Sequence, residues 1–173
     1  MKTNLPKSAK FLIAIIAQLT IAFGLVVSNA FLLARGTEVL LPIEPFDPRD
    51  PLRGDYAVLS YEISNIKKDF FPDEGASLKR NDSVYVSLAK KGDYWVAESA
   101  SVKKPEQGLF IRGNIDYLYS WGAGIAVEYG IEEYFIPEGT GAALERKMRA
   151  QRAFAKVMVD KNGKAILKDI VFE

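Results

Sequence analysis

One segment marks the passage from an apolar N-terminus to a folded domain, and it reads Asp47-Pro48-Arg49-Asp50-Pro51-Leu52-Arg53-Gly54-Asp55-Tyr56-Ala57-Val58-Leu59-Ser60-Tyr61. Each proline fixes its own φ angle and favours an extended conformation in the aspartate before it, which predicts a rigid spacer. Gly54 then permits a turn at little steric cost. Beyond the turn, alternation with a period of two predicts a strand over residues 55–63, with Ala57, Leu59, Tyr61 and Ile63 on the core face and Tyr56 on the other.

A charge-free segment of 24 residues, 11–34, precedes this region. As a helix it would be about 36 Å long, enough to cross a hydrocarbon core of about 30 Å. Three lysines and no acidic residue come before it, so the positive-inside rule predicts residues 1–10 as a cytoplasmic tail. The sequence therefore predicts a transmembrane anchor over residues 11–34, through which the chain contacts the lipid bilayer, and an extracytoplasmic domain over residues 35–173.

A cleaved signal peptide is the main alternative to this anchor. Ser28-Asn29-Ala30 has small residues at suitable offsets for cleavage after Ala30. The apolar run is longer than the usual 7–15 residues, however, and it continues beyond that site. An uncleaved anchor is therefore favoured, and both readings place the domain outside the cytoplasm.

Composition excludes several kinds of chemistry. The chain has 173 residues, no cysteine and no histidine. Disulfides, thiol nucleophiles, Ser-His-Asp triads and the usual zinc ligands are therefore absent. Residues 35–173 hold 20 basic and 22 acidic groups, because three of the 23 basic residues lie before them. A near-neutral domain lacks the basic footprint of nucleic-acid binding, and no nucleic-acid partner, metal or cofactor is predicted.

Alternating hydrophobicity predicts further strands along the domain: 38–45, 82–90, 94–102, 109–119, one through 125–131, one ending at Pro137, 153–160 and 164–172. Asn162-Gly163 is a strong hairpin signal between the last two. Thr140 is a plausible N-cap for a short helix over residues 142–151. Because strands follow strands, the predicted fold is mainly β, an antiparallel curled sheet of barrel or sandwich type with one short helix.

Acidic residues gather at two places in the chain. Glu44, Asp47, Asp50 and Asp55 fall within twelve residues, which makes a calcium site conceivable, but turn capping and pairing with the nearby arginines are favoured. Glu132, Glu133, Glu138 and Glu145 could supply a carboxylate pair for acid–base chemistry. Nothing in the sequence shows that two of them meet, and adjacent Glu132 and Glu133 would face opposite ways on a strand.

Gly54, Asp55, Tyr56, Leu59 and Tyr61 resemble the signature of the bacterial, membrane-anchored GDYXXLXY family. The resemblance extends to the Asp-Pro lead-in and to two later segments, 129–132 and 134–139, with Glu145 following. It implies a bacterial inner-membrane protein with a periplasmic domain, associated with multi-pass membrane proteins. It carries over no catalytic residue, because the family has none assigned.

The two matching regions suggest one site. If the strand from Asp55 pairs with the strand ending at Pro137, then Tyr56, Tyr61, Tyr134 and Glu138 could converge near the membrane. The candidate interaction residues are Arg53, Gly54, Asp55, Tyr56, Leu59, Tyr61, Tyr134, Pro137, Glu138, Gly139 and Glu145.

Three functions remain open at this point. The first is a non-enzymatic interaction subunit of a membrane-protein system. The second is an envelope hydrolase that uses carboxylates among Asp55, Glu138 and Glu145. The third is a ligand-binding module whose site is a tyrosine-rich face of Tyr117, Tyr119 and Tyr129.

Overall fold

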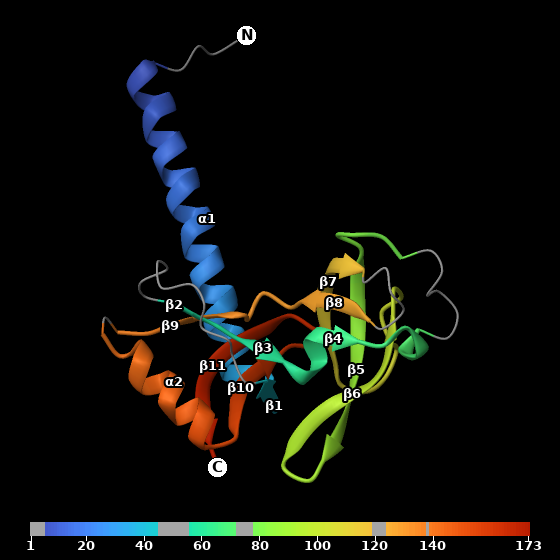
Figure 1. The fold of residues 1–173 in the computed structure, drawn as a ribbon. Helices are drawn as coiled ribbons and strands as arrows, with labels where there is room; N and C mark the ends of the chain where they lie inside the picture. The colour runs from blue at the N-terminus through green and yellow to red at the C-terminus, as the bar shows by residue number, and fades with distance from the viewer. Residues whose placement is uncertain (1–5, 45–55, 72–77, 119–123, 138) are drawn as a thin grey trace.

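The computed structural model describes residues 6–44, 56–71, 78–118, 124–137 and 139–173, and for residues 56, 57, 142 and 145 it describes the backbone alone (Figure 1). Within these ranges the fold is mainly β, with antiparallel strands curled into a barrel-like arrangement, as the sequence predicts. Two α-helices accompany the strands. One is long and N-terminal, and the other is short.

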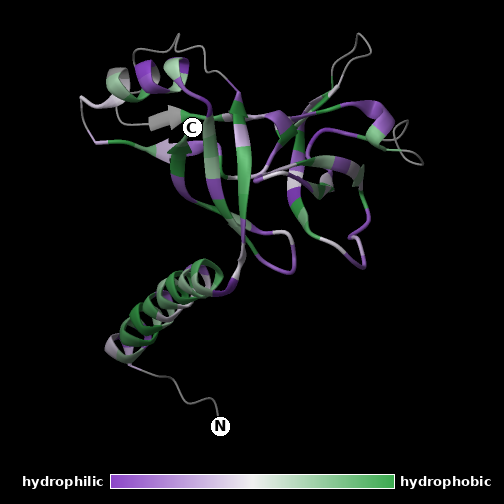
Figure 2. Ribbon diagram, turned by 90° about the horizontal axis from the view of Figure 1, so that it is seen from below, coloured by the Kyte–Doolittle hydropathy of each residue, from purple (hydrophilic) through white to green (hydrophobic). Residues whose placement is uncertain are grey.

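Helix α1 spans Lys7–Arg35 and projects away from the domain (Figures 1 and 2). It contains the whole predicted apolar segment and is long and apolar enough to cross a membrane. Its large apolar side chains are exposed almost throughout, and only Leu32 is buried, against the domain. An amphipathic helix of a soluble core would bury one face. Exposure of apolar residues all round therefore fits a membrane span or a signal sequence.

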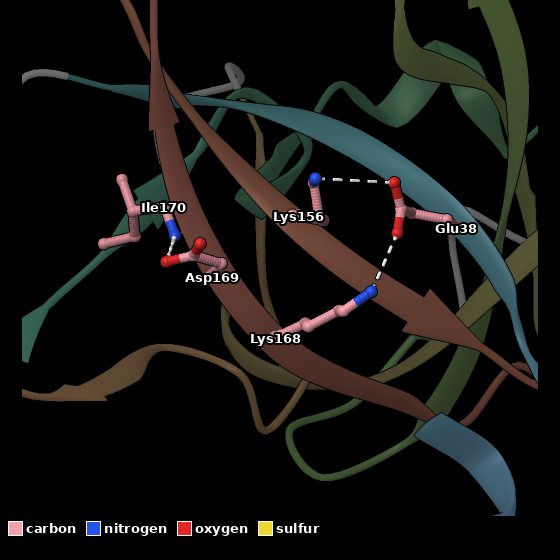
Figure 3. A network of polar contacts seen from close by, with 5 residues as sticks. All are labelled: Glu38, Lys156, Lys168, Asp169 and Ile170. Atoms are coloured by element: carbon pink, nitrogen blue, oxygen red, sulfur yellow. Dashed lines mark hydrogen bonds and ion pairs between the residues drawn. The ribbon is translucent and has the colours of Figure 1, made fainter. Parts of the chain in front are cut away.

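The first sheet has the strand order β11-β10-β1-β3, formed by β1 (Thr37–Glu44), β3 (Ser60–Tyr61), β10 (Ala153–Val159) and β11 (Ala165–Phe172). The predicted C-terminal hairpin is present, and its turn places Gly163 at φ +78°. On β1, the Glu38 carboxylate lies between Lys156 and Lys168, at 3.7 and 3.2 Å from their ammonium groups (Figure 3). These exposed ion pairs lie across three neighbouring strands.

The second sheet has the order β4-β8-β7-β5-β6, formed by β4 (Asn65–Ile66), β5 (Ser83–Lys91), β6 (Tyr94–Ser101), β7 (Phe110–Leu118) and β8 (Ile125–Glu128). Val84, Val86 and Leu88 are buried along β5, which confirms the predicted alternation. Two short 3-10 turns, η1 (Glu62–Ser64) and η2 (Lys68–Phe70), flank β4.

One hydrophobic core lies between the two sheets. It combines residues of the first sheet, such as Leu41 and Val157, with residues of the second, such as Val86 and Ile111. Strand β1 also lies close to β6, which brings the sheets together along one side. Full burial of one such aliphatic side chain contributes about 1.5–3 kcal/mol, so this cluster is the main stabilising feature of the domain.

The alternation predicted for the strand over residues 109–119 is interrupted before Tyr117. The pairing of β7 with β8 shifts between Ile115 and Tyr117, so an irregularity interrupts the alternation there. A bulge of this kind reverses the direction of the side chains that follow it. Ile115 is buried, whereas Tyr117, two residues further along the chain, is 54% exposed.

Helix α2 spans Gly141–Ala150, close to the predicted range, and Thr140 occupies its N-cap position. The capping function is not confirmed, because the Thr140 side chain makes no cap hydrogen bond to the helix. Its hydroxyl instead donates to the Pro137 carbonyl at 2.6 Å. The backbone of Thr140 is already near-helical. Its side chain therefore stabilises the turn that precedes the helix and does not cap the first turn of the helix.

Candidate functional site

The segment that follows Asp55 forms an isolated two-stranded ribbon with the segment before Pro137. Strand β2 (Tyr56–Val58) pairs antiparallel with β9 (Glu133–Phe135), with Tyr56 opposite Phe135 and Val58 opposite Glu133. The ladder continues one step, because the Leu59 N–H donates to the Glu132 carbonyl at 2.7 Å. The two regions singled out in the sequence are therefore neighbours in the fold, as expected.

The single strand predicted over residues 55–63 is broken into pieces. Strand β2 ends at Val58, β3 covers Ser60–Tyr61, and η1 begins at Glu62. The cause is a change of partner, since β2 pairs with β9 whereas β3 pairs with β1. The predicted alternation nevertheless persists where side chains are described: Leu59, Tyr61 and Ile63 are buried, and Val58 and Glu62 are exposed.

Two buried tyrosines join this segment to the chain around Ile131. Tyr61 is 0% exposed, and its hydroxyl donates to the Ile131 carbonyl, 70 residues away. Tyr129 is also buried, and its hydroxyl donates to the Ile63 carbonyl. Each hydroxyl thus donates to the carbonyl of a buried residue, and buried carbonyls need such partners. Leu59 and Tyr61 therefore stabilise the fold from inside.

Glu132 closes the turn that presents these carbonyls. One carboxylate oxygen accepts the Tyr129 N–H at 2.6 Å, and the other accepts the Ile131 N–H at 2.9 Å. Gly130 lies between them at φ +76°, a conformation that glycine adopts without strain. Both oxygens are thus engaged by backbone donors, which is a structural role. Glu133 is exposed on the ribbon, so the two adjacent glutamates do diverge.

Burial and the neighbouring Glu132 carboxylate set the ionisation of the tyrosines. Burial is the larger cause and the negative charge the smaller, and both raise the pKa of Tyr61 and of Tyr129. Both phenols therefore stay protonated at physiological pH and keep donating their hydrogen bonds.

A surface that the sequence reasoning did not select lies on the β2–β9 ribbon. Phe135 is 65% exposed and Val58 is 39% exposed. Directly paired residues of neighbouring strands share a face, and so do residues two apart. Val58, Glu133 and Phe135 therefore lie on one outward face, whereas Tyr134 lies on the other and packs partly against the core. We call this outward face the ribbon face. In the sequence, the alternation of Glu133, Tyr134 and Phe135 would have predicted that Glu133 and Phe135 share a face.

The remaining predicted site residues have mixed outcomes. Arg53, Gly54, Asp55 and Glu138 lie outside the described residues, as do Asp47 and Asp50 of the conceivable calcium site. Tyr56 and Glu145 are placed by their backbone alone. Pro137 and Gly139 are exposed, and Gly139 has φ +77°.

The tyrosine-rich face of the ligand-binding hypothesis does not form between Tyr117 and Tyr129. Tyr117 is exposed after the β7 irregularity, and Tyr129 is buried in the core. Tyr119 lies outside the described residues. Within the described ranges, no group of three or more acidic residues is arranged to hold a metal ion. Burial, followed by repulsion from Asp116 and Glu132, raises the pKa of Glu128, yet this side chain lies at the surface.

Comparison with known proteins gives one match. A family model described as GDYXXLXY protein matches residues 18–170, which is most of the chain and includes part of α1. No curated protein and no solved structure matches the chain. The ribbon and the buried tyrosines fall within the matched region, and so does the C-terminal hairpin except for its last two residues.

Proposed function

Because the chain belongs to the GDYXXLXY family, whose function is not established, we propose a role from the geometry of its signature. The protein is a single-pass inner-membrane protein whose periplasmic β-domain binds a multi-pass membrane protein of the same system. The observation that carries the proposal is the ribbon face, on which Val58 of the signature segment and Phe135 of β9 are exposed beside Glu133. The role is that of an interaction subunit, without catalysis.

The first support is the division of the signature into buried and exposed parts. Leu59 and Tyr61 are buried and hold β2 against the chain around Ile131. Tyr56 is paired with Phe135 at the ribbon, where Val58 and Phe135 are exposed. A sequence pattern that combines internal anchors with an exposed apolar face is what a docking surface needs, because interfaces are built on apolar and aromatic residues at a rigid support.

The second support is the helix. A span through α1 keeps the domain at the membrane, where membrane proteins are the nearest partners. Lysines before the span favour a cytoplasmic N-terminus, which leaves the domain in the periplasm. The family resemblance points to multi-pass partners, and the ribbon face gives such a partner an apolar surface to bind.

The carboxylate hydrolase and the tyrosine-lined ligand site gain no comparable support. Both oxygens of Glu132 are occupied by backbone N–H groups. Two other carboxylates of the hydrolase hypothesis, those of Asp55 and Glu138, lie outside the described residues. Of the tyrosines in the ligand-site hypothesis, Tyr117 is exposed and Tyr129 is buried. No specific observation favours either alternative over a docking role.

The test is purification of the full-length protein from its own membranes in mild detergent, with identification and stoichiometry of co-eluting proteins. One variant carries Val58→Ser and Phe135→Ser, and a second carries Asp55→Ala and Tyr56→Ala. Tyr117→Ser serves as the control, because it also replaces an exposed apolar side chain, on a strand outside the ribbon.

A multi-pass protein that co-elutes at a fixed ratio with the wild type and the control should be lost from both ribbon variants. Thermal unfolding of each variant confirms that the domain is still folded. A folded protein that co-elutes with nothing, or a partner retained by both variants, would contradict the proposed docking role.

A further inference from the structure

A cleft of about 1110 Å³ lies between α1 and the domain. Its walls come from α1 and the two residues after it, within 24–37, from Trp95 of β6, from residues 104–110, and from the end of β10 with the β10–β11 turn, within 159–164. Two contacts fix the helix against the domain here. Leu32 is buried, and the Lys164 ammonium donates to the Asn29 side-chain oxygen at 2.8 Å. The cleft is thus a defined feature of this junction. Figure 2 shows α1 projecting from the domain there.

One part of the cleft lining is apolar. Val27 and Phe31 of α1 face it from the helix side, and Trp95 and Leu109 contribute from the domain. Tryptophan is enriched where proteins meet the boundary between hydrocarbon and water, because its ring is apolar and its indole N–H is polar. This lining suits an acyl chain or the glycerol end of a lipid.

The other part of the lining is basic. Four cationic side chains belong to the cleft: Arg35, Lys104, Lys161 and Lys164. Two carboxylates also line it, those of Glu106 and Asp160.

The Asp160 carboxylate is already engaged inside its own turn. One of its oxygens accepts the N–H groups of Asn162 and Lys164, both at 2.8 Å. The cleft therefore has four cationic side chains and two carboxylates, and one of these carboxylates is already hydrogen-bonded within its own turn. The mouth of the cleft favours a negatively charged group.

The lysines keep donors for such a group. Lys104 donates to the Asn162 side-chain oxygen at 2.9 Å, and Lys164 donates to Asn29. An ammonium carries three N–H donors, so one hydrogen bond leaves capacity for a phosphate oxygen. The asparagine contacts also hold both ammonium groups in place.

The height of the cleft along α1 matches the membrane boundary. A hydrocarbon core of about 30 Å takes about 20 helical residues, so a span that begins at Phe11 leaves the hydrocarbon near Ala30. Gly24 and Val27 then lie at acyl-chain depth, whereas Arg35 lies at headgroup level. Phe31 and the Lys164–Asn29 hydrogen bond lie at the boundary itself, between these two levels.

We infer that this cleft binds an anionic phospholipid, with its phosphate among Lys104, Lys161 and Lys164 and its apolar portion against Val27 and Phe31. A soluble phosphate would use only the basic part, and a neutral lipid would leave the cations without a counter-charge. The inference rests on the membrane span of the proposed function and is independent of the ribbon face and its partner.

The experiment is native mass spectrometry of the full-length protein in non-ionic detergent, titrated with phosphatidylglycerol or with phosphatidylcholine of the same acyl chains. Each basic residue near anionic lipid strengthens binding about five-fold. We expect one phosphatidylglycerol to be retained at least about ten-fold more tightly than phosphatidylcholine. A variant with Lys104→Gln, Lys161→Gln and Lys164→Gln should lose this preference.

The matched control replaces three exposed lysines that do not line the cleft, as Lys67→Gln, Lys68→Gln and Lys79→Gln, and it should bind like the wild type. A double variant, Lys104→Gln with Lys161→Gln, keeps the Lys164–Asn29 hydrogen bond and guards against loss of the helix–domain junction. It should weaken phosphatidylglycerol binding about 25-fold at most.

A second measurement locates the lipid. The chain has two tryptophans, so Trp121→Phe leaves Trp95 as the single fluorophore. Phosphatidylglycerol brominated in its acyl chains should quench Trp95 more strongly than the brominated phosphatidylcholine, and the triple lysine variant should remove the difference.

Several outcomes would overturn the inference. These are equal binding of the two lipids, unchanged preference in the triple variant, or displacement of the lipid by inorganic phosphate. If the triple lysine variant loses a co-eluting protein but keeps its preference for phosphatidylglycerol, the cleft would be assigned to a protein partner instead. Extraction of the protein from membranes by alkaline carbonate would refute the membrane span itself. This result would separate a failure of the proposed anchoring from a failure of the lipid site alone.

Discussion

Replacing Tyr61 with phenylalanine removes one oxygen atom from the centre of the domain and leaves the ring in place. The lost hydroxyl donates to the Ile131 carbonyl, and Tyr61 and Ile131 are both buried, at 0% and 2% exposure, so the site has little contact with water. A buried polar group without a partner costs about 1–3 kcal/mol. For a chain of this size, 1 kcal/mol lowers the melting temperature by about 2–4 °C. We therefore expect Tyr61→Phe to lower the melting temperature by about 2–12 °C near pH 7.

The same variant should also change how stability depends on alkaline pH. Burial, followed by the charge of Glu132, raises the pKa of Tyr61 in the folded state, whereas the unfolded chain has a tyrosine pKa of about 10. Below pH 10 both states keep the proton, and the contribution to stability is fully present. Above pH 10 the unfolded state loses the proton while the folded state keeps it. The free energy of unfolding then falls, by about 1.4 kcal/mol per pH unit for each such tyrosine.

The assay is thermal unfolding of the full chain in mild detergent, monitored by circular dichroism at a series of pH values between 7 and 11.5. The wild type should lose stability above pH 10 faster than Tyr61→Phe, because the variant has one buried phenol fewer. The stability gap between the two proteins should therefore be largest near neutral pH and narrow as the pH rises. Tyr129→Phe should behave in the same way, since its pKa is raised by the same two causes.

Tyr85→Phe is the matched control. Tyr85 is half-buried in β5 and contacts Phe110 edge-to-face with ring centroids 5.7 Å apart, a contact that the phenylalanine ring keeps. Its melting temperature should stay close to that of the wild type. Equal melting temperatures for Tyr61→Phe and the wild type at pH 7, or parallel curves above pH 10, would refute the role assigned to the buried hydroxyl.

Three further substitutions test the packing and the polar contacts, each by thermal unfolding of the full chain. Gly113→Ala should destabilise the domain by about 1–3 kcal/mol or more, because a Cβ there would lie 2.5 Å from a Val127 methyl carbon and 2.7 Å from the Glu128 carbonyl oxygen; an unchanged melting temperature would show that β7 and β8 can separate freely. Glu132→Gln should cost about 1–3 kcal/mol, since the amide NH2 that replaces one carboxylate oxygen is a donor and cannot accept a backbone N–H, and a neutral effect would contradict its turn-closing role. Glu38→Gln should cost less than about 1 kcal/mol and the loss should shrink at high salt, because its ion pairs are solvent-exposed; a loss of several kcal/mol would show that they are not screened.

Local patterns in the sequence predicted much of this fold. The charge-free run predicted the long N-terminal helix, and alternation with a period of two predicted the strands β5, β6, β10 and β11. These features follow from neighbouring residues alone, because helix and strand periodicity place side chains on faces without reference to the rest of the chain. The pairing of the signature region with the segment before Pro137 was also expected, from the matching of two regions to one family.

Other features depended on contacts between distant residues. The irregularity that exposes Tyr117 arises where β7 pairs with β8, and the break at Leu59 arises because β2 and β3 have different partners. No local pattern encodes either one. Likewise, nothing within the signature shows that the Tyr61 hydroxyl will meet the Ile131 carbonyl.

The exposed ribbon face and the cleft beside α1 illustrate the same division. The sequence by itself determined that the chain carries an apolar helix, a β-domain and the residues of the family signature. Only the tertiary structure decided that Leu59 and Tyr61 are internal, that Val58 and Phe135 are exposed, and that lysines from the β10–β11 turn and the 104–109 loop meet α1. The physical reason is that strand direction and side-chain periodicity are local properties. Strand partners, hydrogen bonds across 70 residues and the docking of a helix are instead fixed by the packing of the whole core.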